Sequence, residues 1–554
     1  MTKRILIIGG VAGGASCATR LRRLDESCEI LLFDRGAHVS FANCGLPYYV
    51  GDVITEEKSL LVASPELFRD RFNIMVKVRH EVTAIDRQRQ VISVSNLATG
   101  SVREERYDAL VLAPGALAIK PPIPGIDAPG VFSVRTIPDS QLVRSWITDH
   151  HAHSALIIGG GFIGLEMAEN LHHRGLAVTI VEKTTQLMPP LDPEVAEPVR
   201  VRLQEAGVTV RLGEAVTALR SESGSLVAAT ESGGSIRSDL VILAIGVKPE
   251  TTLARAAGLS IGASGGIAVD DAMRTSDPRI WAVGDAVETS EFTTGIKVVI
   301  PLAGPANRQG RIAADAICGR SARFRGVQAT SVCGAFGLVI ASTGASEKLL
   351  QRAGITGYQA VHLHPGHHVG YYPGAKPIHM KVIYRQSDGR VLGAQAVGEE
   401  GVEKRIDVIA MAIQLGGTMH DLSEAELCYA PQFGAAKDPV NIAGFIADNQ
   451  LSGDAPLADL ATCGTAGHTL LDVRESAETA LGTVPGALII PLHQLRARWR
   501  EVPPGAPVDV MCAAGQRAYY AVRFLRQQGV DARTCSGGWY TWQQQRQRQR
   551  CGSA

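Results

Sequence analysis

The hydrophobic positions of this chain fall into short unbroken runs, each followed by glycines and then by a stretch with helical spacing. The first run covers residues 5–8, and we expect a helix over residues 15–24 after its glycine-rich turn. A second run, residues 30–33, ends at Asp34. Unbroken apolar strands that alternate with helices are typical of a parallel sheet covered on both faces. The pattern therefore predicts an α/β fold.

The same strand, turn and helix recur in the middle of the chain. We expect a strand over residues 154–158, a helix over 165–174 and a second strand over 178–181 that ends at Glu182. Glycines let the backbone approach a pyrophosphate at a helix N-terminus, and the acid after the second strand binds a ribose diol. Because both copies keep these features, the sequence predicts two bound dinucleotides. The expected contacts are Gly9, Gly10, Ala12 and Gly13 in the first copy, and Gly159, Gly161, Phe162, Ile163 and Gly164 in the second.

Two more apolar runs flank the second unit. Residues 110–116 include Ala113 and Gly115, and residues 280–286 include Gly284 and Asp285. In flavoproteins with two dinucleotides, the first run closes the first half of the flavin domain, and the second places an acid near the ribityl hydroxyls. We therefore expect FAD in a domain that is split around a nicotinamide domain.

The acid of the second unit also bears on the choice of nucleotide. Glu182 hydrogen-bonds a diol and repels a 2′-phosphate, whereas the adjacent Lys183 would attract one. NADH is therefore the expected nucleotide and NADPH the alternative.

Beyond residue 326 the apolar positions alternate with polar ones. Strands are expected over residues 332–340, 378–384 and 391–397, with a helix over 404–415. This pattern predicts an antiparallel sheet with helices, in a separate α+β domain. A small, polar stretch then predicts a linker before a compact C-terminal module.

Composition and charge narrow the choice of partners. The 554 residues carry 55 basic and 55 acidic side chains and only 5% aromatics, so no nucleic-acid partner is expected. The first strand leaves no room for a signal peptide, and no apolar run reaches the roughly 18 residues of a membrane helix. Ten cysteines without framework spacing indicate reduced thiols. We expect a cytoplasmic protein without membrane contact.

A histidine cluster raises the question of a bound metal. The cluster consists of His362, His364, His367 and His368, and we expect it to have no carboxylate or cysteine partner. Loop histidines of this kind more often have no metal. No metal site is therefore expected.

Cys44 restricts the reactions that this protein could catalyse more than any other residue does. It follows the second strand of the first unit, so we expect it beside the flavin, as a thiolate favoured by helix N-termini and positive charge. A Cys-x4-Cys redox pair would need a second cysteine at position 49, which is Tyr49. The atom with which a single redox cysteine forms its bond must therefore be a sulfur or an oxygen of the substrate.

Cys512 has a different setting. It ends a strand over residues 508–511 and precedes a short loop with Gly515 and a helix over 518–527. Such a loop points successive N–H groups at one spot and stabilises an anion on the sulfur, to which Arg517 adds positive charge. The anion could be a thiolate, a persulfide or, in a larger loop, a phosphate.

These motifs carry a resemblance over nearly the whole chain. Residues 1–448 resemble the CoA-disulfide reductases, which are flavin disulfide reductases with a single cysteine. Residues 460–545 resemble a rhodanese domain with Cys512 as sulfur carrier. The matching motifs in the reductase part lie at residues 9–14, 40–44, 371–374, 404–408, 429–431 and 437–441.

The resemblance implies an activity and an assembly. Electrons would pass from NADH through FAD to Cys44, which forms a mixed disulfide with coenzyme A and reduces CoA persulfide, polysulfide or CoA disulfide. Tyr371 and Tyr429 of a homodimer's partner subunit would protonate the leaving thiolate, and Cys512 with Arg517 would handle sulfane sulfur. The CoA site would consist of Ser16, Arg20, Arg23, Ser40, Asn43, Asn307 and Lys437. Further FAD or nucleotide contacts would be Arg35, Val82, Ala303, Gly246 and Phe433.

The resemblance also implies domain boundaries. They are 1–117 and 246–325 for the split FAD domain, 118–245 for the NAD(P)H domain, 326–448 for a dimerisation domain, 449–462 for a linker, 463–545 for a rhodanese domain and 546–554 for a disordered tail.

The C-terminal module departs from the usual rhodanese pattern in one motif, and two alternative functions are open. Rhodanese domains usually have Gly-His-Ile where this chain has Gly482, Thr483 and Val484, but that His is not a sulfur ligand, so we expect little effect. NADH peroxidases and oxidases share the fold but have a His at the position of Ala12. A redox sensor or sulfur carrier that uses flavin only structurally is the second alternative, and rapid bleaching of the flavin by NADH would exclude it.

Overall fold

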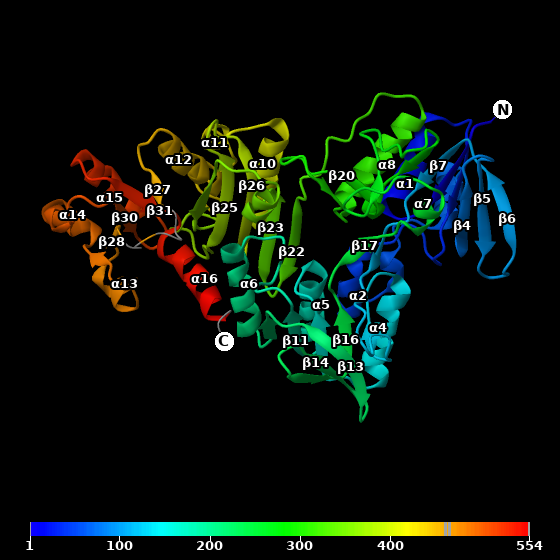
Figure 1. The fold of residues 1–554 in the computed structure, drawn as a ribbon, viewed down its shortest axis with the longest axis horizontal. Coiled ribbons are helices and arrows are strands. Elements are labelled where there is room, and N and C mark those ends of the chain that lie inside the picture. Colours follow the sequence, from blue (N-terminus) through cyan, green and yellow to red (C-terminus); the bar gives the residue numbers. More distant parts are fainter. Residues whose placement is uncertain (1, 459–462, 464–466, 552–554) are drawn as a thin grey trace. The chain divides into compact units, whose positions relative to one another are not determined.

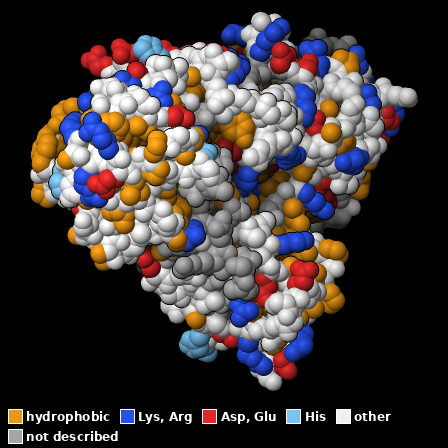
Figure 2. Space-filling model, turned by 60° about the vertical axis from the view of Figure 1, so that its left-hand side comes forward, with side chains coloured by type: hydrophobic (Ala, Val, Ile, Leu, Met, Phe, Trp, Pro, Cys, Tyr) orange, Lys and Arg blue, Asp and Glu red, His pale blue; other side chains and the backbone are white. Residues whose placement is uncertain are grey.

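The computed structural model describes residues 2–458, 463 and 467–551, which divide into two compact units (Figure 1). The first unit consists of Met1–Lys183 and Gly207–Ala329, and the second of Thr184–Ala206 and Thr330–Ala554. None of the described helices combines the length and the apolar character needed to cross a membrane. Figure 2 shows acidic and basic side chains interspersed over the face in view.

The first sheet of unit 1 is parallel and has the order β19-β7-β1-β2-β3. Its strands are β1 (Arg4–Ile8), β2 (Glu29–Phe33), β3 (Met75–Lys77), β7 (Ala109–Leu112) and β19 (Ile280–Ala282). Since β19 pairs with β7, the predicted split of this domain in the sequence is confirmed. Helix α1 (Ala12–Leu24) follows β1 and begins three residues earlier than expected.

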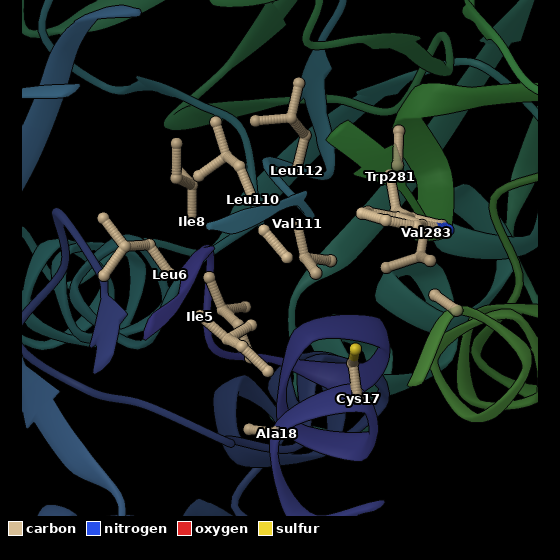
Figure 3. Close-up of a cluster of buried hydrophobic side chains, with 14 of the residues drawn as sticks. Ile5, Leu6, Ile8, Cys17, Ala18, Leu110, Val111, Leu112, Trp281 and Val283 are labelled. Carbon is tan, nitrogen blue, oxygen red and sulfur yellow. The ribbon is translucent and has the colours of Figure 1, made fainter. Parts of the chain in front are cut away.

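The core of this sheet is built from the predicted apolar runs. Figure 3 shows Ile5 and Val111 in one cluster with Cys17 and Ala18 of α1, and all four side chains are at most 1% exposed. Burying an Ile or Val side chain contributes about 1.5–3 kcal/mol. The apolar faces thus hold the glycine-rich turn after β1 in place.

The second parallel sheet has the order β12-β11-β10-β16-β9 and confirms the predicted second copy. It contains β9 (Val131–Phe132), β10 (Ser154–Ile158), β11 (Ala177–Glu182), β12 (Thr209–Leu212) and β16 (Leu240–Leu243), with helix α5 (Phe162–His173) after β10. Other elements of unit 1 are β4 (His80–Asp86), β5 (Val91–Asn96), β6 (Val102–Arg106), β8 (Ala116–Ala118), β13 (Val216–Glu222), β14 (Ser225–Thr230), β15 (Ser235–Ser238), β17 (Val247–Pro249), α3 (Pro65–Phe72), α4 (Ile137–Asp149) and α8 (Ala303–Ile317).

Unit 2 contains an antiparallel sheet with the order β22-β23-β26-β25-β24. The single strand expected over residues 332–340 is wrong, because this run forms a hairpin. Its turn residues Phe336 (φ 51) and Gly337 (φ 78) both have positive φ, as tight hairpin turns require. The elements are β22 (Ser331–Ala335), β23 (Leu338–Gly344), β24 (Tyr358–Leu363), β25 (Ile378–Arg385), β26 (Val391–Gly398), α6 (Pro193–Glu205), α9 (Glu347–Arg352), α10 (Val402–Leu415), α11 (Met419–Ser423) and α12 (Pro439–Leu451).

The C-terminal sheet of unit 2 is parallel, with the order β27-β31-β30-β28-β29. Its elements are β27 (Leu457–Ala458), β28 (Thr469–Asp472), β29 (Leu488–Ile489), β30 (Val508–Met511), β31 (Ala532–Cys535), α13 (Ser476–Ala480), α14 (Leu492–Arg498), α15 (Gln516–Gln527) and α16 (Gly538–Cys551). Apolar residues of α15 pack on β28 and β30.

Two expectations at the ends of this module need correction. The expected linker, residues 449–462, starts inside α12 and includes β27, which pairs with β31; its residues 459–462 lie outside the described residues. The expected disordered tail is helical through Cys551, because its Gln and Arg residues favour helix and continue α16. Residues 552–554 lie outside the described chain.

Candidate functional site

The first glycine-rich turn has the geometry of a dinucleotide cradle. A Cβ on Gly9 would lie 2.0 Å from the carbonyl oxygen of Ala113, and a Cβ on Gly14 would lie 1.9 Å from that of Gly9. Only glycine permits these approaches. Asp34 accepts hydrogen bonds from the N–H groups of Gly10 (3.0 Å) and Gly36 (2.8 Å). Helix α1 has no side-chain cap and no acid in its first turn, so its free N–H groups suit a pyrophosphate.

The other expected FAD residues also lie in unit 1. Gly115 has φ +74, Gly284 donates its N–H to Gln309 (2.7 Å), and Ala303 begins α8. Burial raises the pKa of Asp285, which Arg135 opposes from 3.5 Å. The donor set therefore fits FAD. Arg35 lies 3.9 Å from Glu81 on the surface, and Val82 is buried in β4.

The second turn repeats the geometry of the first. A Cβ on Gly159 would lie 2.4 Å from the carbonyl oxygen of Ala244, and one on Gly164 would lie 2.1 Å from that of Gly159. Glu182 is 7% exposed and accepts the N–H of Gly160 at 2.7 Å. Gly161 caps α5 without a side chain, which leaves the N–H groups of Phe162 and Ile163 at the open helix end; Gly246 follows β16 with φ +109. These residues fit a nicotinamide dinucleotide.

Cys44 lies in a short 3₁₀ turn (Asn43–Gly45) before helix α2 (Leu46–Val50), and it is exposed. The expected thiolate is not favoured by the charges around it. Partial desolvation, Glu166 and Asp285 raise the pKa of the Cys44 thiol, and Arg135 opposes them. Two acids thus outweigh the single cation.

Sequence reasoning missed Arg135 and Glu166. Arg135 donates to the carbonyl of Ala116 (3.0 Å) and accepts at its own carbonyl the side-chain amide of Asn43 (3.3 Å). Burial and the neighbouring Glu169 raise the pKa of Glu166 to about 7. Both residues come from elements far from Cys44 in the sequence, so no local pattern reveals them.

The expected CoA residues of unit 1 form two groups. Ser16 and Arg20 lie on α1, where the Ser16 hydroxyl bonds Asn307 of α8 and Arg20 forms an ion pair with Asp315 (2.7 Å). Arg23 is exposed on the same helix. In the second group, Ser40 donates its N–H to the carbonyl of Gly10 (2.8 Å) and Asn43 contacts Arg135.

The expected residues of the dimerisation domain all lie in unit 2, and two of them are in contact. The hydroxyl oxygens of Tyr371 and Tyr429 are 2.7 Å apart, and this hydrogen bond raises the pKa of Tyr429. Tyr371 is 73% exposed and Phe433 65%, and Lys437 is also exposed. These polar and aromatic side chains are thus accessible to a molecule that binds the surface formed by the two segments.

At the second cysteine site the sulfur of Cys512 is buried. Cys512 is 2% exposed, and the N–H of Gly515 lies 3.1 Å from its Sγ. Gly515 has φ +104, a conformation that favours glycine. The N–H groups of Trp539 (2.8 Å) and Tyr540 (3.1 Å) hold the carbonyls of Cys512 and Ala513. The predicted loop after β30 therefore exists, with one backbone N–H on the sulfur.

Arg517 is less free than expected, because it forms two hydrogen bonds with Glu478, at 2.6 and 2.7 Å. This pair lowers the pKa of Glu478 to about 2. Arg474 is 2% exposed, pairs with Asp472 at 2.7 Å and lies 4.3 Å from the Trp539 ring. Glu478 lies outside the motif that predicted the site.

The structure gives the histidine cluster partners that the sequence did not reveal. His362 lies 3.1 Å from Glu194, so the expectation that it lacks a carboxylate partner is wrong. His364 contacts Thr541 and His379, each at 2.7 Å. Among the described residues, Asp192, Glu194 and Glu347 could together hold a cation. The ammonium group of Lys381 already contacts all three.

Two dinucleotide cradles, with the exposed Cys44 in the same unit as both, define a flavin-dependent oxidoreductase of the two-nucleotide class. Residues 3–310 match the pyridine nucleotide-disulphide oxidoreductases, residues 331–438 match the dimerisation domain of that family, and residues 457–545 match the rhodanese-like domain. The chain belongs to the pyridine nucleotide-disulphide oxidoreductase family.

Three similar proteins extend the match beyond the family. Coenzyme A disulfide reductase of Staphylococcus epidermidis is 34% identical over 80% of this chain and 99% of its own length. The crystal structure of reduced CoADR-RHD from Bacillus anthracis is 43% identical, covers 98% of both chains and superposes with a TM-score of 0.96. An NAD-dependent persulfide reductase from A. fulgidus is 36% identical, with 97% of this chain and 100% of its own covered and a TM-score of 0.90.

Proposed function

We propose that this protein uses NADH, FAD and Cys44 to reduce coenzyme A disulfide and coenzyme A persulfide. The observation that carries the proposal is the exposed Cys44 beside the first dinucleotide cradle, with Tyr instead of a second cysteine at position 49. It is supported by the full-length similarity to proteins named CoADR-RHD and persulfide reductase.

The reaction follows from what one cysteine can do. The Cys44 thiolate attacks the disulfide or persulfide, forms a mixed disulfide with coenzyme A, and expels the second sulfur as a thiolate or as hydrogen sulfide. FAD, when bound in the first cradle, supplies the transfer of an electron pair from NADH that resolves this mixed disulfide. Per cycle, one NADH and one proton convert CoA persulfide to CoA and hydrogen sulfide, or CoA disulfide to two CoA.

We assign the Tyr371 and Tyr429 hydroxyls as the acid that protonates the leaving thiolate, from the partner subunit of a homodimer. The match to a dimerisation domain supports the dimer. So do the exposed apolar side chains of Met411, Leu415 and Phe433, which are 55%, 78% and 65% exposed. Met411 and Leu415 lie one turn apart on α10, and neighbouring exposed apolar side chains mark interaction sites.

The C-terminal module would supply sulfane sulfur. We propose that Cys512 carries it as a persulfide and exchanges it with coenzyme A, whose flexible arm then brings it to Cys44. Tethering the two sites in one chain raises their effective concentration. The free state of the nine cysteines whose side chains the structure describes supports a reducing compartment such as the cytoplasm.

Two cysteine variants test the proposal side by side. Cys44→Ser should keep FAD but lose turnover with every sulfur substrate. Cys512→Ser should reduce CoA disulfide normally but turn over slowly when sulfur must enter through the rhodanese domain. Cys428→Ser is the matched control, because Cys428 is the other exposed thiol of the described chain.

The possible results separate the two parts of the proposal. Turnover of CoA disulfide by Cys44→Ser would refute the role of Cys44. Unchanged use of every sulfur donor by Cys512→Ser would refute the coupled mechanism and leave the reductase assignment standing.

A further inference from the structure

Two loops carry the tyrosine hydroxyls, and one buried arginine joins them. The first tyrosine loop, residues 367–374, contains Tyr371, and the second tyrosine loop, residues 429–438, contains Tyr429. Between them lies Arg405 of α10, which is 1% exposed. Arg405 belongs to the motif at residues 404–408, which is part of the family resemblance. The proposed reaction gives this residue no role.

The guanidinium of Arg405 bonds both loops at once. Its Nη2 donates to the carbonyl of His367 in the first tyrosine loop and to Oδ2 of Asp438 in the second, each at 2.8 Å. Nε adds a longer bond to Oδ1 of Asp438 (3.3 Å), and Nη1 donates to the carbonyl of Gly401 (2.9 Å). A planar fork with several donors suits this task, and an ammonium group does not.

The attachment at Asp438 is itself rigid. Asp438 is 2% exposed and caps α12, where it accepts the N–H of Val440 (3.1 Å) while Asn441 accepts the N–H of Asp438 (3.1 Å). The amide of Asn441 donates to the carbonyl of Ala425 (2.8 Å), ahead of the second tyrosine loop. Movement of Arg405 would therefore disturb the end of that loop at Asp438.

The two loops also meet directly, but at a single backbone hydrogen bond. The N–H of Val369 donates to the carbonyl of Gly434 at 3.0 Å. Beyond it the Tyr371 and Tyr429 side chains are exposed and contact each other through their hydroxyls, 2.7 Å apart. Exposed side chains on loops depend on buried supports for their geometry.

We propose that Arg405 is a positioning residue for the reaction, which holds the Tyr371–Tyr429 hydroxyl pair together by tying the two tyrosine loops to α10. This inference rests on the proposed function of the pair as the acid for the leaving thiolate. Arg405 itself touches no reacting atom. A misplacement of about 1 Å at such a site can cost on the order of 100-fold in rate.

The test uses Arg405→Lys in the FAD-loaded protein, with Lys404→Met as the control on the same helix. Lysine keeps a charge for Asp438 but cannot also reach the two carbonyls in the same fork. We expect turnover of CoA disulfide to fall about 10- to 100-fold, while NADH bleaches the flavin at the normal rate. Because the hydroxyl pair would separate, the alkaline limb of the pH profile should move to lower pH. The Lys404→Met control should match the wild type.

Combining the Arg405 and tyrosine variants distinguishes the positioning role of Arg405 from the acid role of the two tyrosines. Arg405→Lys added to Tyr371→Phe and Tyr429→Phe should cause no further loss. A further, multiplied loss, or a bleaching rate that falls in parallel with turnover, would overturn the inference while the tyrosine role stands. Full turnover by the double tyrosine variant would instead refute the acid role, and the inference with it. If Arg405→Lys does not fold, Arg405→Met is measured in the same way, with bound FAD as the criterion of folding.

Discussion

Replacing Glu166 by Gln should make Cys44 more reactive, and by an amount that depends on pH. The carboxylate of Glu166 is one of the charges that raise the pKa of the Cys44 thiol. With a pKa of about 7, Glu166 is about half ionised at pH 7, about nine-tenths ionised at pH 8 and about one-tenth at pH 6. The substitution therefore removes almost a full negative charge at pH 8 and very little at pH 6.

A like charge beside a thiol commonly changes the thiolate population by about tenfold, which corresponds to about 1.4 kcal/mol. The ratio of the alkylation rates of Glu166→Gln and wild type should thus be close to one at pH 6. It should rise through about pH 7 towards roughly tenfold at pH 8.

The assay is the rate of iodoacetamide alkylation of Cys44 in the FAD-loaded protein, in a Cys428→Ser background, because Cys428 is also exposed. Glu169→Gln is the control, because it should change the ionisation of Glu166 in the opposite direction. Glu169 helps to raise the pKa of Glu166, so its removal leaves Glu166 more ionised and should not speed alkylation. Equal rates for Glu166→Gln and wild type from pH 6 to 8 would refute the reasoning.

Three further outcomes follow from the structure. NADH should reduce the flavin faster than NADPH, because buried Glu182 would meet the 2′-phosphate; equal kcat/KM values would show that Lys183 outweighs it. Lys381→Met should lower the free energy of unfolding, measured with urea, by about 3–5 kcal/mol, since it removes the ammonium group that contacts the buried carboxylates of Asp192 and Glu194. A loss below about 1 kcal/mol would mean that the cluster is solvated. Light scattering should give a dimer, and a fully active monomer would contradict the assignment of Tyr371.

Much of the fold was predictable because its determinants are local. Unbroken apolar runs specify strands buried on both faces, and the strands over residues 154–158 and 508–511 were placed at their observed ends. The hairpin within residues 332–340 was missed, because apolar residues continue through its turn and only Gly337 marks it.

The candidate site also combines features that the sequence determines with features that only the tertiary structure decides. Sequence by itself determined the two dinucleotide turns, their acids, and the settings of Cys44 and Cys512, because each depends on residues next to one another in the chain. Only the tertiary structure decided which charges act on them. It brought Glu166 and Arg135 to Cys44, paired Arg517 with Glu478 and joined two loops through Arg405. Side chains that meet across distant segments do so because the packing of the sheets brings them together, and no local spacing records that packing.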